Sequence, residues 1–113
     1  PTAAEAAAIA AFERRAPQAW TGPAPVAERI AGAAKPSWRI GPPFAPDAGG
    51  DVFAEGPEGA FIDARRRPDG GFDLVLDQAG PQAQGSFDVR LTRTAGMVAH
   101  EATLRLDAGT TKP

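Results

Sequence analysis

The chain has no cysteine and only one histidine in its 113 residues. It therefore has no disulfide, no thiolate nucleophile and no thiolate metal ligand. Its 12 basic and 14 acidic residues nearly balance, which leaves no basic field to hold a phosphate backbone. We therefore expect no nucleic-acid partner. No stretch of the sequence approaches the roughly 18 apolar residues that span a membrane.

The start of the sequence leaves the origin of the chain open. Pro1 does not begin a signal-peptide pattern. It fits a native protein without its initiator methionine, a mature secreted form, or a chain cut just after a membrane anchor. Ten arginines stand against two lysines, and alanine, glycine and proline are abundant, a composition associated with bacteria of high genomic GC content. We expect a bacterial protein, located in the periplasm or elsewhere outside the cytoplasm.

The length indicates one domain with a single modest core. Residues 1–16 are rich in alanine and glutamate and carry Ile9 and Phe12 at helical spacing. Thr2 followed by Glu5 matches a capping box, so we predict an N-terminal helix over residues 1–16.

Residues 17–50 form a proline-rich zone. Seven prolines lie between Pro17 and Pro46, together with several large apolar residues. Because it is costly to leave so many large apolar side chains in water, we predict an irregular wrap packed on the fold rather than a disordered chain. We expect one short helix within it, from Val26 to Ala33.

Residues 51–107 have the pattern of strands. Apolar residues alternate there at period two, which is typical of half-buried strands in an antiparallel sheet. The three clearest segments are Phe72-Leu74-Leu76, Phe87-Val89-Leu91 and Val98-His100-Ala102-Leu104-Leu106. The predicted fold class is therefore α+β, with the N-terminal helix and the proline-rich wrap packed on a four- to five-stranded antiparallel meander. Residues 108–113 are expected to be a tail, and Leu74, Phe87 and Leu104 the heart of the core.

Turn chemistry predicts the register of a first hairpin. The sequence Arg67-Pro68-Asp69-Gly70-Gly71 suits a three-residue loop, with Gly70 in the left-handed conformation. This loop pairs Arg67 with Gly71. It follows that Arg65 faces Asp73.

A second hairpin is predicted around an even-length turn at Ala95-Gly96. This turn places Leu91 opposite His100 and keeps apolar residues facing one another. Joining the two hairpins side by side gives a cross-strand row of alternating charge. That row consists of Arg65, Asp73, Arg90 and Glu101. A fifth strand, Val52 to Glu55, is expected beside Ile62.

His100 is the one side chain whose ordinary chemistry suits a general base near neutral pH. The predicted register places it on the inner face beside Phe72 and Leu91, near Arg66. A catalytic histidine needs a positioned partner, and the sequence indicates none. A structural histidine is therefore favoured.

Other chemical motifs are missing from the sequence. Asp47, Asp51 and Glu55 lie in one loop but do not have the spacing of a calcium site. No serine lies in a nucleophile elbow, and no glycine pattern suits a phosphate. We expect no catalytic residue, no metal and no cofactor.

Two function classes remain open. The first is a non-catalytic interaction or assembly module, an accessory or structural subunit of a larger bacterial complex of the envelope or secretion type. It would dock a protein partner through a sheet edge or through the wrap. An alanine-rich helix followed by an antiparallel meander resembles the soluble part of pilin-like or pseudopilin subunits, which implies a membrane anchor outside the chain. This resemblance is one of fold only.

The alternative is a small-molecule-binding or enzymatic α+β cone fold with a pocket near His100. The sequence favours a protein partner over a small molecule, because it offers no catalytic group. The candidate pocket or partner contacts are Trp20, Trp38, Arg66, Phe72, Leu91 and His100.

Overall fold

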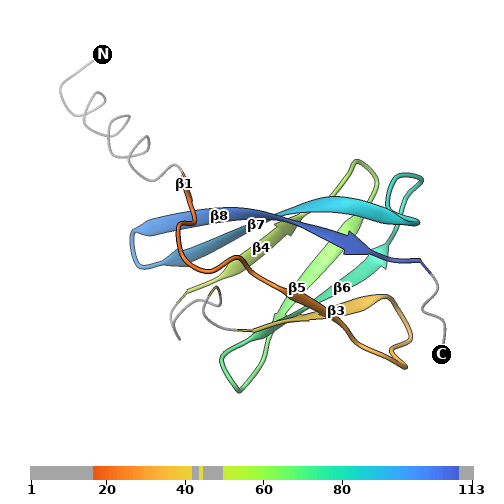
Figure 1. The fold of residues 1–113 in the computed structure, drawn as a ribbon, viewed down its shortest axis with the longest axis horizontal. Helices are drawn as coiled ribbons and strands as arrows, with labels where there is room; N and C mark the ends of the chain where they lie inside the picture. The colour runs from red at the N-terminus through yellow and green to blue at the C-terminus, as the bar shows by residue number, and fades with distance from the viewer. Residues whose placement is uncertain (1–16, 42–43, 45–49, 110–113) are drawn as a thin grey trace, which may run out of the picture.

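A computed structural model describes residues 17–41, 44 and 50–109 of the chain. These residues form a sandwich of β-strands (Figure 1). In chain order the strands are β1 (Gln18–Ala19), β2 (Ala27–Arg29), β3 (Ser37–Ile40), β4 (Val52–Glu55), β5 (Phe61–Arg66), β6 (Phe72–Gln78), β7 (Ser86–Ala95) and β8 (Val98–Asp107).

The strands lie in two four-stranded sheets. Sheet 1 has the order β1-β8-β7-β4, and sheet 2 has the order β2-β3-β6-β5. Every neighbouring pair is antiparallel except β1 with β8, which is parallel. From β2 to β8 this is the strand order of the constant-type immunoglobulin sandwich, and β1 adds a short parallel strand beside the last one. An architecture of this kind hosts many functions, so it identifies none.

The predicted α+β class is wrong, because the described residues contain no helix. The helix expected from Val26 to Ala33 is instead strand β2 followed by a turn. Glu28 is exposed between two half-buried residues, an alternation that suits the edge of a sheet. Pro25 disfavours a helical conformation at Ala24, the residue before it, and the chain enters β2 without a helical turn. The predicted helix over residues 1–16 lies outside the described residues.

The proline-rich zone is not only a wrap, because it supplies an interior strand. Strand β3 lies between β2 and β6 in sheet 2. Trp38 and Ile40 are buried on its inner face, and Arg39 between them is exposed. The alternation of apolar and polar residues from Trp38 to Ile40 is visible in the sequence. The surrounding prolines favoured an irregular chain instead, so no strand was predicted there.

The single meander is also wrong, because β6 and β7 belong to different sheets. Strand β6 pairs with β3, which places Asp73 opposite Arg39 instead of Arg90. The segment between Gln78 and Ser86 carries the chain from one sheet to the other. The predicted charge row therefore does not form.

Strand β4 has the bounds predicted for it, Val52–Glu55, but a different neighbour. It pairs with β7, with Phe53 opposite Thr92, rather than with the strand that contains Ile62. Glu55 accepts a hydrogen bond of 2.7 Å from the guanidinium of Arg90 across this pair. The glycine-bearing turn after β4 thus leads from sheet 1 into sheet 2.

The register of the first hairpin is confirmed. The Arg67 amide donates to the carbonyl of Gly71 over 2.8 Å, and Gly70 has a φ of 94°. Arg65 lies opposite Asp73, as predicted. Local turn chemistry is therefore sufficient to determine this part of the sheet.

The second hairpin is shifted by two residues from its predicted register. Arg93, not Leu91, lies opposite His100. The loop is Gly96-Met97, and Gly96 has a φ of 62°. A glycine at the first central position is the preference of a type II′ turn, which matches the twist of the flanking strands. A shift of two preserves parity, so the predicted residues still face inward.

The core lies between the two sheets. Leu74 and Phe87 are buried in it, as predicted, whereas Leu104 is only half-buried and Leu106 is buried. The rings of Trp38 and Phe87 meet edge to face across the sheets, with centroids 6.1 Å apart. The buried apolar residues are Trp38, Ile40, Phe44, Phe72, Leu74, Leu76, Ala83, Phe87, Val89, Leu91 and Leu106.

Truncating Phe87 should test this core. Phe87→Ala is expected to lower the free energy of unfolding by roughly 3–5 kcal/mol, because it removes a ring that bridges the sheets and leaves a cavity. Phe53→Ala is the matched control, since Phe53 is 59% exposed and the loss of its ring should cost at most about 0.5 kcal/mol. Urea unfolding measures both values. Equal losses in the two variants would contradict the described core.

The first hairpin should show a pH dependence. The guanidinium of Arg67 and then the amide of Gly71 donate to the Asp69 carboxylate, and they lower the pKa of Asp69. A lowered folded-state pKa contributes stability that is present above the unfolded value of about 3.9 and is lost as pH falls through the folded value. In Asp69→Asn, we expect the free energy of unfolding to fall less steeply than in the parent between about pH 5 and pH 2. The prediction would be refuted if the free energies of unfolding of the parent and of Asp69→Asn changed in parallel with pH.

Candidate interaction site at the β8 edge

The inner face of the β7–β8 hairpin ends in two polar side chains covered by a tryptophan. Arg93 and His100 lie opposite each other, and the indole of Trp20 packs on both. The centroid of the Trp20 ring is 5.6 Å from that of His100 and 5.0 Å from the guanidinium carbon of Arg93. Phe44 meets the indole edge to face at 5.4 Å. We call Trp20, Phe44, Arg93 and His100 the Trp20 cluster.

Two hydrogen bonds hold Trp20 in place. Its amide donates to the carbonyl of Glu101 on β8 over 2.8 Å. Its indole Nε1 donates to the carbonyl of Pro23 over 2.8 Å. Trp20 is thus the last residue of the N-terminal segment that bonds to β8. Its side chain also covers this end of the core.

The pairing of β1 with β8 stops after Trp20 because the chain bends at Gly22 and Pro23. The hydrogen bond from the Trp20 indole to the carbonyl of Pro23 lies across this bend. The chain leaves β8 and passes to β2 in sheet 2. Figure 1 shows this crossing segment between the labels β1 and β3.

The far end of β8 is closed by Arg29. Its Nη1 donates to the carbonyls of Asp107 and Gly109, over 2.8 and 3.3 Å. The guanidinium of Arg29 lies 5.4 Å from the ring centroid of Trp38, which fixes its position. Between Trp20 and Arg29, no other described strand pairs with this side of β8.

The open backbone groups of β8 can be assigned from one hydrogen bond. The carbonyl of Glu101 points toward β1, because it accepts from Trp20. Backbone groups alternate in direction along a strand, so those of Thr103 and Arg105 point to the same side. We call residues 102–106, with these outward N–H and C=O groups, the β8 edge.

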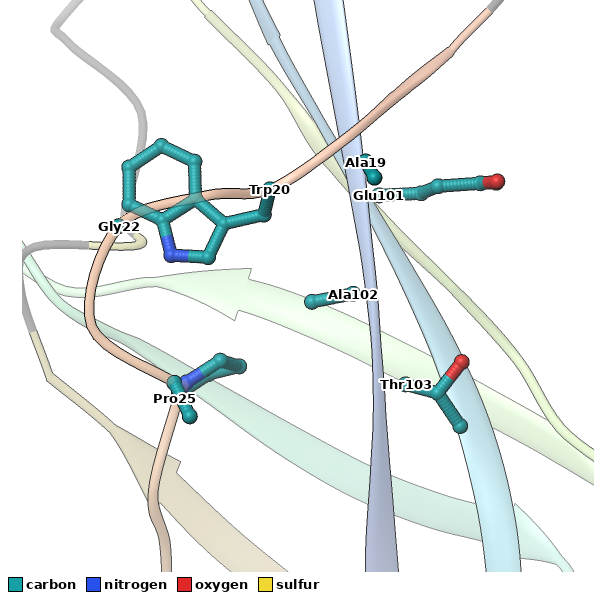
Figure 2. Close-up of a pocket in the computed structure, with 8 residues that line it drawn as sticks. Ala19, Trp20, Gly22, Pro25, Glu101, Ala102 and Thr103 are labelled. Carbon is teal, nitrogen blue, oxygen red and sulfur yellow. The ribbon is translucent and has the colours of Figure 1, made fainter.

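A groove of about 410 Å³ lies at the start of the β8 edge (Figure 2). Figure 2 shows the side chain of Ala102 toward Trp20, while those of Glu101 and Thr103 point to the other side of β8. The groove combines small apolar side chains with backbone groups. Its lining residues are Ala19, Trp20, Gly22, Ala24, Pro25, Glu101, Ala102 and Thr103.

The structure brings together two separate pairs of the six predicted site residues: Trp20 packs on His100, and Arg66 lies opposite Phe72. Trp38, Phe72 and Leu91 belong to the core, with 3%, 1% and 0% of their surface exposed. Arg66 lies in the other sheet, where it lines a small cavity of about 80 Å³ beside Phe72.

Sequence reasoning missed Arg93 as the neighbour of His100. A type II′ turn at Gly96-Met97 would have placed them opposite each other, so the glycine was the available signal. It also missed the bend at Gly22 and Pro23, where the chain leaves β8.

Nδ1 of His100 is buried and has no hydrogen-bond partner among the residues that the structure describes. Across those same residues, no three histidine, aspartate or glutamate side chains are grouped to hold a metal ion. No helix in the described ranges is long and apolar enough to cross a membrane.

No family model matches this chain. No curated protein and no solved structure matches it at a significant level either. Its function is therefore argued from the geometry of the site.

Replacing Trp20 should test the Trp20 cluster. Trp20→Ala is expected to lower the free energy of unfolding by roughly 2–3 kcal/mol, because the ring and cation contacts are lost together. Trp20→Phe keeps a ring and loses the bond to Pro23, so its cost should be about 1 kcal/mol. Urea unfolding gives the free energies, and the proton resonances of the His100 ring report the loss of the indole. An unchanged His100 spectrum in Trp20→Ala would contradict the stacking.

Proposed function

We propose that this chain is a non-catalytic interaction module, which binds an extended segment of a protein partner as an added strand on the β8 edge. The observation that carries the proposal is the open stretch of β8 between Trp20 and Arg29. Strand addition uses main-chain hydrogen bonds for affinity and neighbouring pockets for specificity.

The dimensions of the β8 edge suit a short segment. Residues 102–106 span about 17 Å at the rise of an extended chain. The outward groups of Thr103 and Arg105 offer two donors and two acceptors to a partner backbone. A segment of about five residues therefore fits between Trp20 and Arg29.

The groove beside Trp20 supplies the side-chain contact. The part of its lining formed by Ala24, Pro25 and Ala102 suits an apolar partner side chain. The opposite face of β8 presents the Thr103 hydroxyl and Arg105, whose guanidinium already bonds Asp88 at 3.2 Å. We infer a partner segment with one apolar anchor and an otherwise polar outer face.

The pilin-like part of the expected function has lost its structural basis. That resemblance required a helix followed by one meander, and the strands form two sheets instead. What supports an interaction module is the β8 edge, which does not depend on that resemblance.

Peptide binding with hydrogen exchange tests the proposal. Selection from a displayed library of random peptides should yield binders with an extended, apolar-anchored motif. The amides of Thr103 and Arg105 should exchange rapidly in the free protein and become protected in the complex, because they then donate to the peptide. The amides of Ala102 and Leu104 point toward β7 and are the internal control, protected in both states.

A proline substitution provides the matched variant. Thr103→Pro removes the outward N–H without removing a bond to β7, and should weaken peptide binding about tenfold or more. Thr103→Ala retains the N–H and should bind within about threefold of the parent. Selection of no peptide, or protection confined to other residues, would refute the proposal.

A further inference from the structure

Strand β5 is a second open edge, on the other side of the sandwich from β8. It is the edge strand of sheet 2 and pairs only with β6 among the described strands. The backbone groups of Arg67 point toward β6, because its amide donates to Gly71. By alternation, the N–H and C=O groups of Ile62, Ala64 and Arg66 point outward. The stretch Ile62–Arg66 is regular, since the one irregularity of the pair lies between Phe61 and Ile62.

The outer face of this strand carries two opposite charges, two residues apart. Asp63 and Arg65 have 47% and 60% of their side-chain surfaces exposed, and they bond each other at 2.8 Å. Asp73, which lies opposite Arg65, has ion pairs with Arg67 at 3.5 Å and Arg39 at 3.8 Å. Arg65 is therefore not required to neutralise Asp73.

Two copies of β5 can pair antiparallel about a two-fold axis in few registers. Outward-pointing residues must lie opposite outward-pointing residues, so the axis passes through a residue and not between two. An axis at Asp63 places Asp63 opposite Asp63 of the second copy. An axis at Arg65 places Arg65 opposite Arg65 of the second copy. Like charges directly opposite each other destabilise a strand pair.

Registers centred further out are poorer as well. An axis at Ile62 crosses the irregularity beside Phe61 and forms no ion pair. An axis at Arg66 brings Arg65 against Arg67. Both shorten the regular stretch that can pair.

Only the register centred on Ala64 satisfies the charges. It places Asp63 opposite Arg65 of the second copy, and Arg65 opposite Asp63 of that copy. The two Ala64 residues exchange N–H···O=C bonds at the axis, as do Ile62 and Arg66. The charged pairs then occupy non-hydrogen-bonded sites, where opposing Cα atoms are only about 4.5 Å apart.

We propose that the chain forms a two-fold dimer with a second copy of itself through β5. The two four-stranded copies of sheet 2 then continue into one sheet of eight strands. The proposal is independent of partner binding at β8. A single strand pair buries less surface than a standard interface, so the dimer should be weak, with a dissociation constant in about the micromolar to millimolar range.

Charge reversal tests the interface. Sedimentation velocity over a concentration series should show reversible dimerisation of the parent protein. Asp63→Arg sets arginine against Arg65, and Arg65→Asp sets aspartate against Asp63, so each should raise the dissociation constant about tenfold. The double variant D63R/R65D restores both pairs with inverted sign and should return to within about threefold of the parent. A thermal melt of each variant confirms folding.

Disulfide trapping tests the register, in a chain with no native cysteine. Opposed Cα atoms at a hydrogen-bonded pair are about 5.5 Å apart, within reach of a disulfide. Ala64→Cys should therefore form a covalent dimer on mild oxidation. Arg66→Cys is the control, because its two thiols would lie on residues about 14 Å apart and should not cross-link.

Three results would overturn the proposal. They are a parent protein that stays monomeric at millimolar concentration, a double variant no better than the single variants, or cross-linking of Arg66→Cys in preference to Ala64→Cys.

Discussion

The contact between Trp38 on β3 and Phe87 on β7 is the link on which the rest of the structure depends, because it joins the inner faces of the two sheets. Trp38 also places the guanidinium of Arg29 over its ring. Arg29 in turn closes the far end of β8 through the carbonyl of Asp107. The far limit of the β8 edge is therefore set from within the core, through Arg29.

The parts of the fold that could be predicted are those encoded by neighbours in sequence. The loop from Arg67 to Gly71 determined its own register, and the bounds of β4 followed from alternation and flanking turns. The placement of β6 and β7 in different sheets could not be predicted in this way. Gly80 and Pro81 suit a hairpin and a crossing between sheets equally well, since both need a tight change of direction. What decides between them is the second neighbour of each strand, β3 for β6 and β4 for β7, and these strands are far away in sequence.

The prolines of residues 17–50 account for the predicted irregular wrap and for the strands that this prediction missed. Pro23, Pro25 and Pro36 do lie in irregular chain between short strands, as predicted. The carbonyl of Pro36 nevertheless accepts from the amide of Leu76 over 2.9 Å, so the chain beside a proline still joins the sheet. The candidate site begins at such an interruption, because the chain bends away from β8 at Gly22 and Pro23. Composition indicated where regular structure would be broken, but not that an unpaired strand would be left there.

The two open edges differ in what they can accept. On β5 the charges alternate so that the strand is complementary to itself in one register, whereas the β8 edge is bounded by Trp20 and Arg29 and lined by small apolar side chains. Strands β7 and β4 separate β8 from the side of the sandwich at which β5 lies. A dimer formed through β5 would therefore leave both β8 edges uncovered, one on each outer flank. Two equal sites on one rigid body raise the effective concentration at the second site once a partner with two segments has bound the first. Weak pairing at β5 and short-segment binding at β8 would then reinforce each other without any contact between them.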